Sequence, residues 1–249
     1  MKKVAHYVIR GEIELLSGTR IGGSDDVLQI GGTDLTCIKD PVTGRPYIPG
    51  SSLKGKMRSS LERIHGAFRR LENKETGVTY VEEAREPCGC ARNDCPVCRV
   101  FGPHKNTNHQ LGPTRIIVRD APLISESFAI ENKTESVNRR DTGAAEHPRT
   151  VERVAGAKFA LEIAVQEFDI DEDFTYKDAD GKELRGVNAL LEVVSHALDE
   201  MERVGVGAGT GKGYGRIRIN WDGRVEKCRR RGRKWTIEEG PCDQRGDNA

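Results

Sequence analysis

Four cysteines lie close together in the chain, at a spacing that could hold a metal ion. They are Cys88, Cys90, Cys95 and Cys98, and the last two form a Cys-x-x-Cys pair. Thiolates at such spacing can converge on one tetrahedral ion, for which structural zinc is the natural occupant. The sequence therefore predicts a zinc site that stabilises its own segment, because catalytic zinc keeps an open coordination position.

The cysteine spacing leaves other ligand sets open. It differs from two Cys-x-x-Cys pairs, so one upstream ligand could instead be His65 or His104. A redox-active Cys-x-x-Cys pair and plain reduced thiols are the remaining alternatives. The chain has seven cysteines, and an odd number with this clustering suits a reducing compartment better than a disulfide framework. We therefore expect a cytoplasmic protein.

A second chemical pattern is the run from Gly205 to Gly215, in which every second residue is glycine and Lys212 and Tyr214 stand between glycines. Such a loop can turn several N–H groups toward an anion and let a phosphate backbone approach closely. The run does not match the dinucleotide-binding fingerprint. The alternative is a flexible connector between a helix and a strand.

A third pattern is a basic helix start. Pro49-Gly50 precedes a helical stretch that carries Lys54, Lys56 and Arg58, and a helix N-terminus with cations nearby is suited to phosphate. The same stretch resembles the first seven positions of a nucleotide-binding P-loop, but Met57 stands where a magnesium-binding Ser or Thr belongs. Nucleotide binding is therefore disfavoured.

Charge is distributed unevenly although the formal net charge is only +1. Residues 54–70 contain six basic residues and one acidic residue, and residues 229–234 form a second basic cluster. Arginines also occupy positions 139, 140, 149 and 153. A polyanion would meet this surface in patches, and the 135–153 span is either an arm that contacts nucleic acid or a solvated loop. No apolar run is long enough to span a bilayer, so we expect no membrane partner.

Hydrophobic periodicity indicates which elements position these residues. Period-two alternation predicts strands at residues 4–16, 115–119, 158–168 and 215–221. Apolar residues spaced three or four apart predict one helix from Leu53 to Leu71, capped by Ser51 or Ser52, and another over residues 190–201. The order strand, helix, strand, strand, helix, strand predicts an α+β fold of the ferredoxin-like βαββαβ type.

Several motifs together resemble one protein family. They are residues 21–26 (IGGSDD), 30–34 (IGGTD), 39–44 (KDPVTG), 48–56 (IPGSSLKGK), 137–140 (VNRR) through 151–154 (VERV), and 209–215 (GTGKGYG). In this order they resemble the RAMP superfamily of CRISPR proteins, and more closely the backbone subunit of the type III-A (Csm) effector complex. The resemblance covers the chain from the first strand to the last.

The resemblance implies one RAMP domain over residues 1–249, as an RNA-recognition scaffold with insertions. The palm core would comprise about 4–72, 114–120 and 157–221, the zinc-bearing insertion about 73–113, the thumb or arm about 121–156, and a basic extension 222–249. In this family an Asp in the loop after the first strand cuts the target RNA with a divalent cation, Mg²⁺ or another, and Asp34 aligns with it. From chemistry alone Asp34 is a turn-former, as are Asp25, Asp26 and Asp40.

The resemblance and the basic patterns together give a set of residues expected to contact RNA: Arg20, Ser51, Ser52, Lys54, Lys56, Arg58, Arg140, Gly209, Gly211, Lys212, Gly213 and Tyr214. The implied partners are CRISPR guide RNA, complementary target RNA, other Csm subunits and further copies of the chain along the guide. The expected activity is a metal-dependent endoribonuclease that cleaves target RNA at regular intervals. The alternative is a structural guide-binding subunit, of type III-A or III-B, without catalysis of its own.

Overall fold

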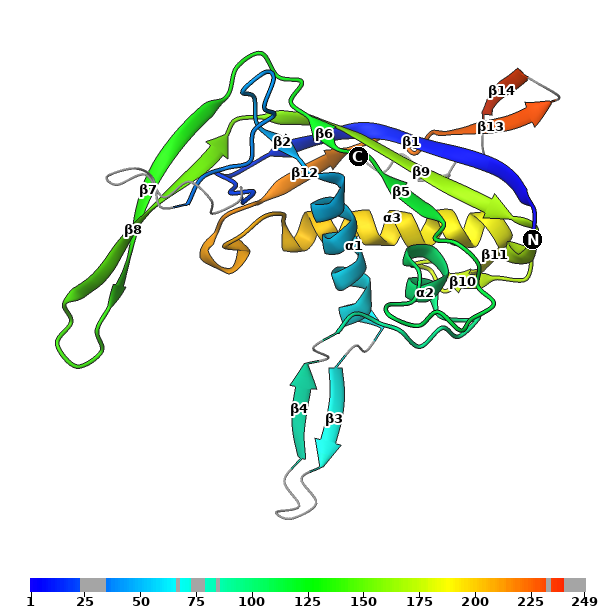
Figure 1. Cartoon of the computed structure of the whole chain (residues 1–249), viewed down its shortest axis with the longest axis horizontal. Coiled ribbons are helices and arrows are strands. Elements are labelled where there is room, and N and C mark those ends of the chain that lie inside the picture. The colour runs from blue at the N-terminus through cyan, green and yellow to red at the C-terminus, as the bar shows by residue number, and fades with distance from the viewer. Residues whose placement is uncertain (23–34, 66–67, 73–78, 84–85, 232–233, 240–249) are drawn as a thin grey trace.

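The computed structural model describes residues 1–22, 35–65, 68–72, 79–83, 86–231 and 234–239. Asp25, Asp26, Asp34 and the last residues of the chain lie outside these ranges. The described chain is a mixed α+β structure built on antiparallel strands. One large sheet and two long helices form its centre, and hairpins extend from it (Figure 1).

The central sheet contains the four strands predicted from alternation. Its order is β14-β13-β1-β9-β5, and β12 also pairs with β1. The strands are β1 (Lys3–Leu15), β5 (Ile116–Val118), β9 (Lys158–Phe168), β12 (Ile217–Asn220), β13 (Val225–Arg231) and β14 (Lys234–Glu239). Strand β1 pairs antiparallel with β9 along most of its length, and its inward residues Tyr7, Ile9 and Ile13 are fully buried. This burial of alternate residues explains the period-two pattern.

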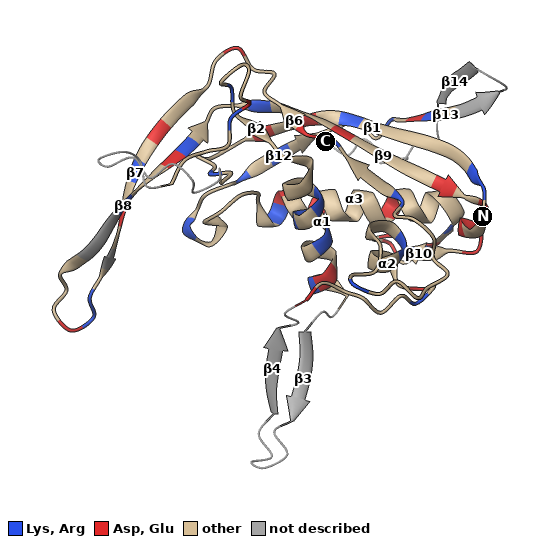
Figure 2. Cartoon of the chain, viewed as in Figure 1, with Lys and Arg blue, Asp and Glu red and all other residues tan. Residues whose placement is uncertain are grey.

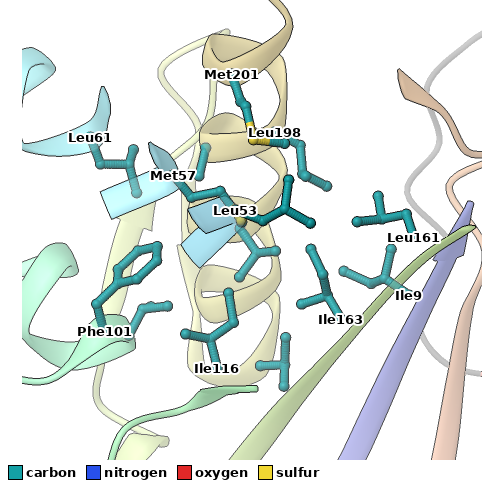
Figure 3. Close-up of a cluster of buried hydrophobic side chains, with 14 of the residues drawn as sticks. Ile9, Leu53, Met57, Leu61, Phe101, Ile116, Leu161, Ile163, Leu198 and Met201 are labelled. Carbon is teal, nitrogen blue, oxygen red and sulfur yellow. The ribbon is translucent and has the colours of Figure 1, made fainter. Parts of the chain in front are cut away.

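Two helices, α1 (Gly50–Ile64) and α3 (Gly186–Val204), contact each other beside the sheet (Figure 1). Leu53, Met57 and Leu61 lie one helical turn apart on α1 and are buried. Figure 3 shows these residues beside Leu198 and Met201 of α3 and beside Ile9 and Ile163 of the sheet. Burial of one helix face against the sheet supplies the main hydrophobic stabilisation.

Helix α1 differs from its prediction at both ends. It ends at Ile64, and residues 68–72 form strand β3 (Phe68–Glu72), which pairs with β4 (Thr79–Glu83) in a hairpin. The predicted continuation to Leu71 was therefore wrong. The predicted serine cap was also wrong, because the N-cap is Pro49 and no side chain caps the helix. Instead the backbone N–H of Gly50 donates to the Asp120 carboxylate at 2.7 Å.

Residues 121–156 contain a long hairpin that projects from one end of the sheet (Figure 1). Its strands are β7 (Ala129–Asn138) and β8 (Ala145–Ala155), which pair antiparallel. A short strand β6 (Ala121–Pro122) precedes it and pairs with β2 (Tyr47–Ile48). The root of the hairpin is joined to the segment after β1, because Thr19 and Val154 exchange two backbone hydrogen bonds of 2.8 and 2.9 Å.

The cysteine-bearing segment lies against the two helices. Its short helix α2 (Pro96–Phe101) contacts both α1 and α3. A buried ion cluster ties it to the sheet: Asp171 accepts from Arg115 at 2.7 Å and from Arg99 at 3.3 Å. Near this cluster, strands β10 (Thr175–Lys177) and β11 (Glu183–Arg185) form a small hairpin before α3.

None of the helices in the described ranges has the length and apolar character needed to cross a membrane.

Candidate functional site

The glycine-rich loop between α3 and β12 is folded tightly against the segment that follows β1. Gly207 has a φ of +78°, and a Cβ there would lie 2.3 Å from the carbonyl oxygen of Arg20. The next residue, Ala208, donates its N–H to that same oxygen at 2.9 Å. Only glycine permits both the positive φ and the close approach. The loop is therefore a bonded, packed structure, unlike the flexible connector considered above.

A hollow of about 460 Å³ lies where this loop meets the middle of the β7–β8 hairpin. Arg20 comes from the segment after β1, Arg149 from β8, and Lys212 and Tyr214 from the loop. The other lining residues are Leu35, Glu135, Ser136, Val151, Ala208 and Gly209. The fold thus brings together three parts of the chain that the sequence separates, and four of the predicted RNA contacts line one hollow: Arg20, Gly209, Lys212 and Tyr214.

Glu135 of β7 joins the hairpin to the loop inside this hollow. One carboxylate oxygen accepts from Lys212 Nζ at 3.0 Å, and the other accepts from the Tyr214 hydroxyl. The hydrogen bond from the Tyr214 hydroxyl lowers the pKa of Glu135 most, and the hydrogen bond from Lys212 lowers it further. Sequence reasoning missed Glu135, because its partners lie 77 and 79 residues away and no local spacing connects them.

The Tyr214 ring is also held by cations from both hairpin strands. Lys133 Nζ and the Arg153 guanidinium each lie 4.6 Å from the ring centroid. Arg153 in turn pairs with Glu131 at 2.8 Å. Positive charge over an aromatic face is favourable, so these contacts fix the ring at the hollow's wall.

A second hollow, of about 300 Å³, lies between the glycine loop and the start of α1. Ser52 and Lys56 line it from the helix, Gly22 from the segment after β1, and Gly207 and Ala208 from the loop. Burial, and then the charge of Arg63, lower the pKa of Lys56. Both hollows share Ala208, so they form adjoining parts of one surface, which we call the glycine-loop groove. Figure 2 shows basic residues on α1 and on the loop after α3.

Two of the predicted basic contacts are held elsewhere. Arg58 pairs with Glu62 at 2.8 Å and donates to the Cys88 carbonyl at 2.8 Å, beside the cysteines. Lys54 Nζ lies 3.5 Å from the Ile116 carbonyl oxygen, and burial followed by the charge of Arg58 lowers its pKa. Neither residue lines the glycine-loop groove as described. Their roles in RNA binding stay predictions.

The remaining predicted contacts surround the groove or lie farther out. Ser51 is exposed at the first turn of α1, whose Gly50 N–H is already bonded to Asp120. Gly211 and Gly213 are exposed in the turn of the glycine loop, next to Lys212. Arg140 is exposed at the far end of the β7–β8 hairpin.

Asp34, the predicted catalytic residue, lies outside the described residues, but the residue that follows it is well defined. Leu35 lines the groove and is bonded to β8: its N–H donates to Thr150 O at 3.2 Å, and its carbonyl accepts from Glu152 N at 2.9 Å. The Glu152 carboxylate accepts from Cys37 N–H at 3.1 Å. The hairpin therefore fixes the chain directly after Asp34.

Asp40 behaves as the turn-former that chemistry alone suggested. Its carboxylate accepts from Val42 N at 3.0 Å and from Thr43 N at 2.7 Å, and these backbone hydrogen bonds keep its pKa below the usual value.

The four clustered cysteines converge as predicted. The Sγ atoms of Cys88, Cys90, Cys95 and Cys98 all lie within 4.8 Å of one another. The Cys88–Cys98 and Cys90–Cys98 separations are 3.7 Å, and the Cys88–Cys95 separation is 4.0 Å. A tetrahedral ion with Zn–S bonds of about 2.3 Å needs sulfurs about 3.8 Å apart. The donor set therefore fits a thiophilic metal ion.

The histidine alternatives do not join this set among the residues that the structure describes. His65 Nε2 lies 3.3 Å from the Tyr176 hydroxyl, and Tyr176 lies 2.7 Å from His196 Nδ1. His104 contacts the centre through its backbone N–H, which donates to the Cys88 carbonyl at 3.1 Å. Glu62 supports the centre from α1 by accepting from Cys88 N–H at 2.8 Å.

Comparison with known proteins assigns the chain to a family. The family model described as RAMPs, the RAMP superfamily, matches residues 12–218. The chain belongs to the RAMP superfamily. The resemblance drawn from the motifs is thereby confirmed, and the matched region contains strands β5 and β9 of the sheet, both long helices, the hairpin and the glycine loop.

The RAMP chain is also similar to curated relatives named CRISPR system Cms endoribonuclease Csm3. It is 40% identical to the protein of Methanothermobacter thermautotrophicus over 70% of this chain and 73% of that one. It is 38% identical to the protein of Methanocaldococcus jannaschii, over 85% of this chain and 77% of that one.

Solved structures of similar fold agree with this membership. A crystal structure of the Csm3–Csm4 subcomplex in the type III-A CRISPR-Cas interference complex matches at a TM-score of 0.52 and 25% identity, over 96% of this RAMP chain and 83% of that one. A cryo-EM structure of the type III-B Cmr-beta complex bound to cognate target RNA matches at a TM-score of 0.50 and 17% identity, over 94% of this chain and 61% of that one. At that identity the match shows the fold alone.

Proposed function

We propose that this chain is the repeating backbone subunit of a type III-A effector complex, which binds CRISPR guide RNA and cleaves the paired target RNA at regular intervals. One observation carries the proposal: Arg20, Arg149 and Lys212 gather around one hollow, next to Lys56 and Ser52 in the adjoining one. The relatives named as Csm3 endoribonucleases support the same assignment.

The glycine-loop groove is suited to a phosphate backbone rather than to a base. Its cations come from several elements, and Gly207 lets the loop pack closely on the backbone of Arg20, which brings Arg20 and Lys212 to the same hollow. Contacts of this kind position nucleic acid without reading its sequence. Sequence choice would then belong to pairing between guide and target, while the protein grips phosphates and shape.

The partners follow from the same assignment. They are the guide RNA, the complementary target RNA, other Csm subunits and further copies of this chain along the guide. We propose that the sheet with α1 and α3 is a ferredoxin-like palm, because its strands β12-β1-β9-β5 and two helices follow the βαββαβ order. The projecting β7–β8 hairpin would be the thumb, which displaces one target nucleotide and so aligns its phosphate for attack. The cytoplasm stays the expected location.

Asp34 is the residue that we propose for cleavage, with Mg²⁺ or another divalent cation as cofactor. The support is the family motif together with the position of Leu35, which follows Asp34 directly and lines the groove. Leu35 is anchored on β8, so the chain directly after the proposed cleavage residue lies against the thumb. The alternative, a structural subunit without catalysis, predicts that loss of this carboxylate leaves target cleavage unchanged.

Zinc is the ion that we propose for the four cysteines. Four thiolates would fill its tetrahedral shell, so the ion would stabilise the segment and take no part in RNA cleavage. Cys95 caps α2, and Cys98 lies inside it. The ion would therefore join the start of α2 to residues 88–90 of the same segment, where the Cys88 N–H is bonded to Glu62 of α1.

Binding of labelled guide-like RNA by the purified chain tests the groove. Lys56→Ala should weaken binding several-fold and flatten its salt dependence, because one phosphate contact is lost. Arg92→Ala is the control and should bind like wild type. It removes an exposed cation that pairs with Asp94 and does not line either hollow. RNA binding that does not respond to salt, or equal affinities of the two variants, would count against the phosphate grip.

A further inference from the structure

Glu135 is the only acid among the described residues that line the larger hollow, where it stands among Arg20, Arg149 and Lys212. A carboxylate repels a polyanion, so its presence in a surface suited to phosphate requires an explanation. Its two oxygens are both engaged, one by Lys212 Nζ at 3.0 Å and one by the Tyr214 hydroxyl.

These two partners are the groups that the loop offers to an anion. A phosphate diester presents two free oxygens, as a carboxylate does, and both accept charge-assisted hydrogen bonds. Glu135 therefore occupies the place of a phosphate. Its side chain is 23% exposed and that of Lys212 is 68% exposed, so the pair is reachable from solvent. The partners also keep the pKa of Glu135 low, which means that the carboxylate is charged at neutral pH.

We propose that Glu135 is an internal competitor for RNA: it holds Lys212 and Tyr214 in the free protein and gives them up to a phosphate of the bound RNA. This inference rests on the proposed RNA-binding function and adds a form of regulation to it. Since Glu135 belongs to β7, the exchange would also remove two of the bonds between the hairpin and the glycine loop, and leave the contacts of Lys133 and Arg153 with the Tyr214 ring. RNA binding and hairpin position would thus be coupled.

The competition has two measurable consequences. Removal of the negative charge frees Lys212 and Tyr214, and the exchange of a partly exposed ion pair corresponds to about a fivefold gain in affinity. The counterions that set the salt dependence are released from the RNA when Lys212 meets a phosphate, so their number is the same with and without Glu135. The slope of log K against log salt concentration should therefore stay unchanged in Glu135→Gln, and the gain in affinity should appear as a vertical offset of that line.

The experiment measures fluorescence anisotropy of a labelled single-stranded RNA over a series of salt concentrations with wild type, Glu135→Gln and Glu86→Gln. Glu86 serves as the control, because it too is a glutamate bonded to a lysine, Lys105, although it is more exposed than Glu135, and it lies in the cysteine-bearing segment away from the groove lining. The two variants change net charge equally. We expect Glu135→Gln to bind about fivefold tighter than wild type with an unchanged salt slope, and Glu86→Gln to match wild type.

Weaker binding by Glu135→Gln would overturn the inference, because it would make Glu135 a support for Lys212 and Tyr214 rather than their competitor. Equal affinities of the two variants would overturn it as well, since the gain would then come from net charge alone. Both results leave the proposed function standing if wild-type binding falls with salt. If the affinity of the wild type for RNA did not change with salt concentration, the proposed function itself would be contradicted.

Discussion

The buried ion cluster of Asp171, Arg99 and Arg115 should dominate the stability of the chain. Asp171 and Arg115 side chains have no exposed surface, and that of Arg99 is 7% exposed. The Asp171 carboxylate also accepts from Phe168 N–H at 3.0 Å. Asp171→Asn keeps the shape but leaves two guanidinium groups buried together without their counter-charge.

The cost can be worked from these contacts. A unit charge pair about 4 Å apart in a medium of effective dielectric constant 20 is worth about 4 kcal/mol. Removing one partner of a buried pair costs about 3–5 kcal/mol in measured cases. Burial lowers the pKa of Arg99, the charge of Asp171 raises it, and the charge of Arg115 lowers it. Once Asp171 is neutral, its charge no longer offsets the repulsion between the Arg99 and Arg115 guanidinium groups. We expect Asp171→Asn to lower the free energy of unfolding by about 3–5 kcal/mol.

Urea unfolding followed by circular dichroism measures this change in free energy, and thermal unfolding should show a drop in Tm of about 6–20 °C. Asp169→Asn is the control, because Asp169 is two residues away, 49% exposed, and bonded only at the surface to the N-terminal segment. It should leave the urea midpoint close to that of wild type, because an exposed ion pair contributes little to stability. If Asp171→Asn were no more destabilised than Asp169→Asn, the reasoning about the buried charges would be refuted.

Two further predictions concern the region around the cysteines. Elemental analysis of the purified chain should find about one zinc ion per protein. Cys95→Ser should lose the ion, whereas Cys37→Ser, which changes a buried thiol outside the cluster, should retain it. A folded wild type without metal would contradict this prediction. Burial, followed by the charge of Glu192, raises the pKa of Tyr176 from 10.0 to about 12, so a spectrophotometric titration should show one phenol ionising near that pH. The pKa of Tyr176 is higher in the folded chain than in the unfolded one, so the neutral phenol stabilises the fold below pH 10, and this contribution is lost as the pH rises toward 12. In Tyr176→Phe, both the late ionisation and the loss of stability should disappear. If either persists, it belongs to another group.

Local patterns predicted what depends on neighbours in the sequence. Alternation located β1 and β9, and the four cysteines were found because they lie within eleven residues of one another. The end of α1 was missed because Phe68 and Leu71 keep helical spacing although the chain has already left the helix at Ile64.

Contacts between distant segments could not be predicted from spacing. The N–H of Gly50 is satisfied by Asp120, 70 residues away, which removed the need for a serine cap. Glu135 and Lys212 are 77 residues apart in the sequence, so no local pattern could predict that this glutamate lies in the groove. Membership of the RAMP superfamily was recognisable from motifs, but the proposed role of Asp34 rests on that resemblance and not on its chemistry.

Target RNA cleavage by the assembled guide complex with Mg²⁺ tests the central claim most directly. Wild type should cut complementary RNA at regular intervals, and Asp34→Ala should abolish those cuts while guide binding is unchanged. Asp40→Ala is the control, since Asp40 bonds only its own turn in the described structure, and it should cleave like wild type. Undiminished regular cleavage by Asp34→Ala would contradict the account and leave the chain as a structural subunit.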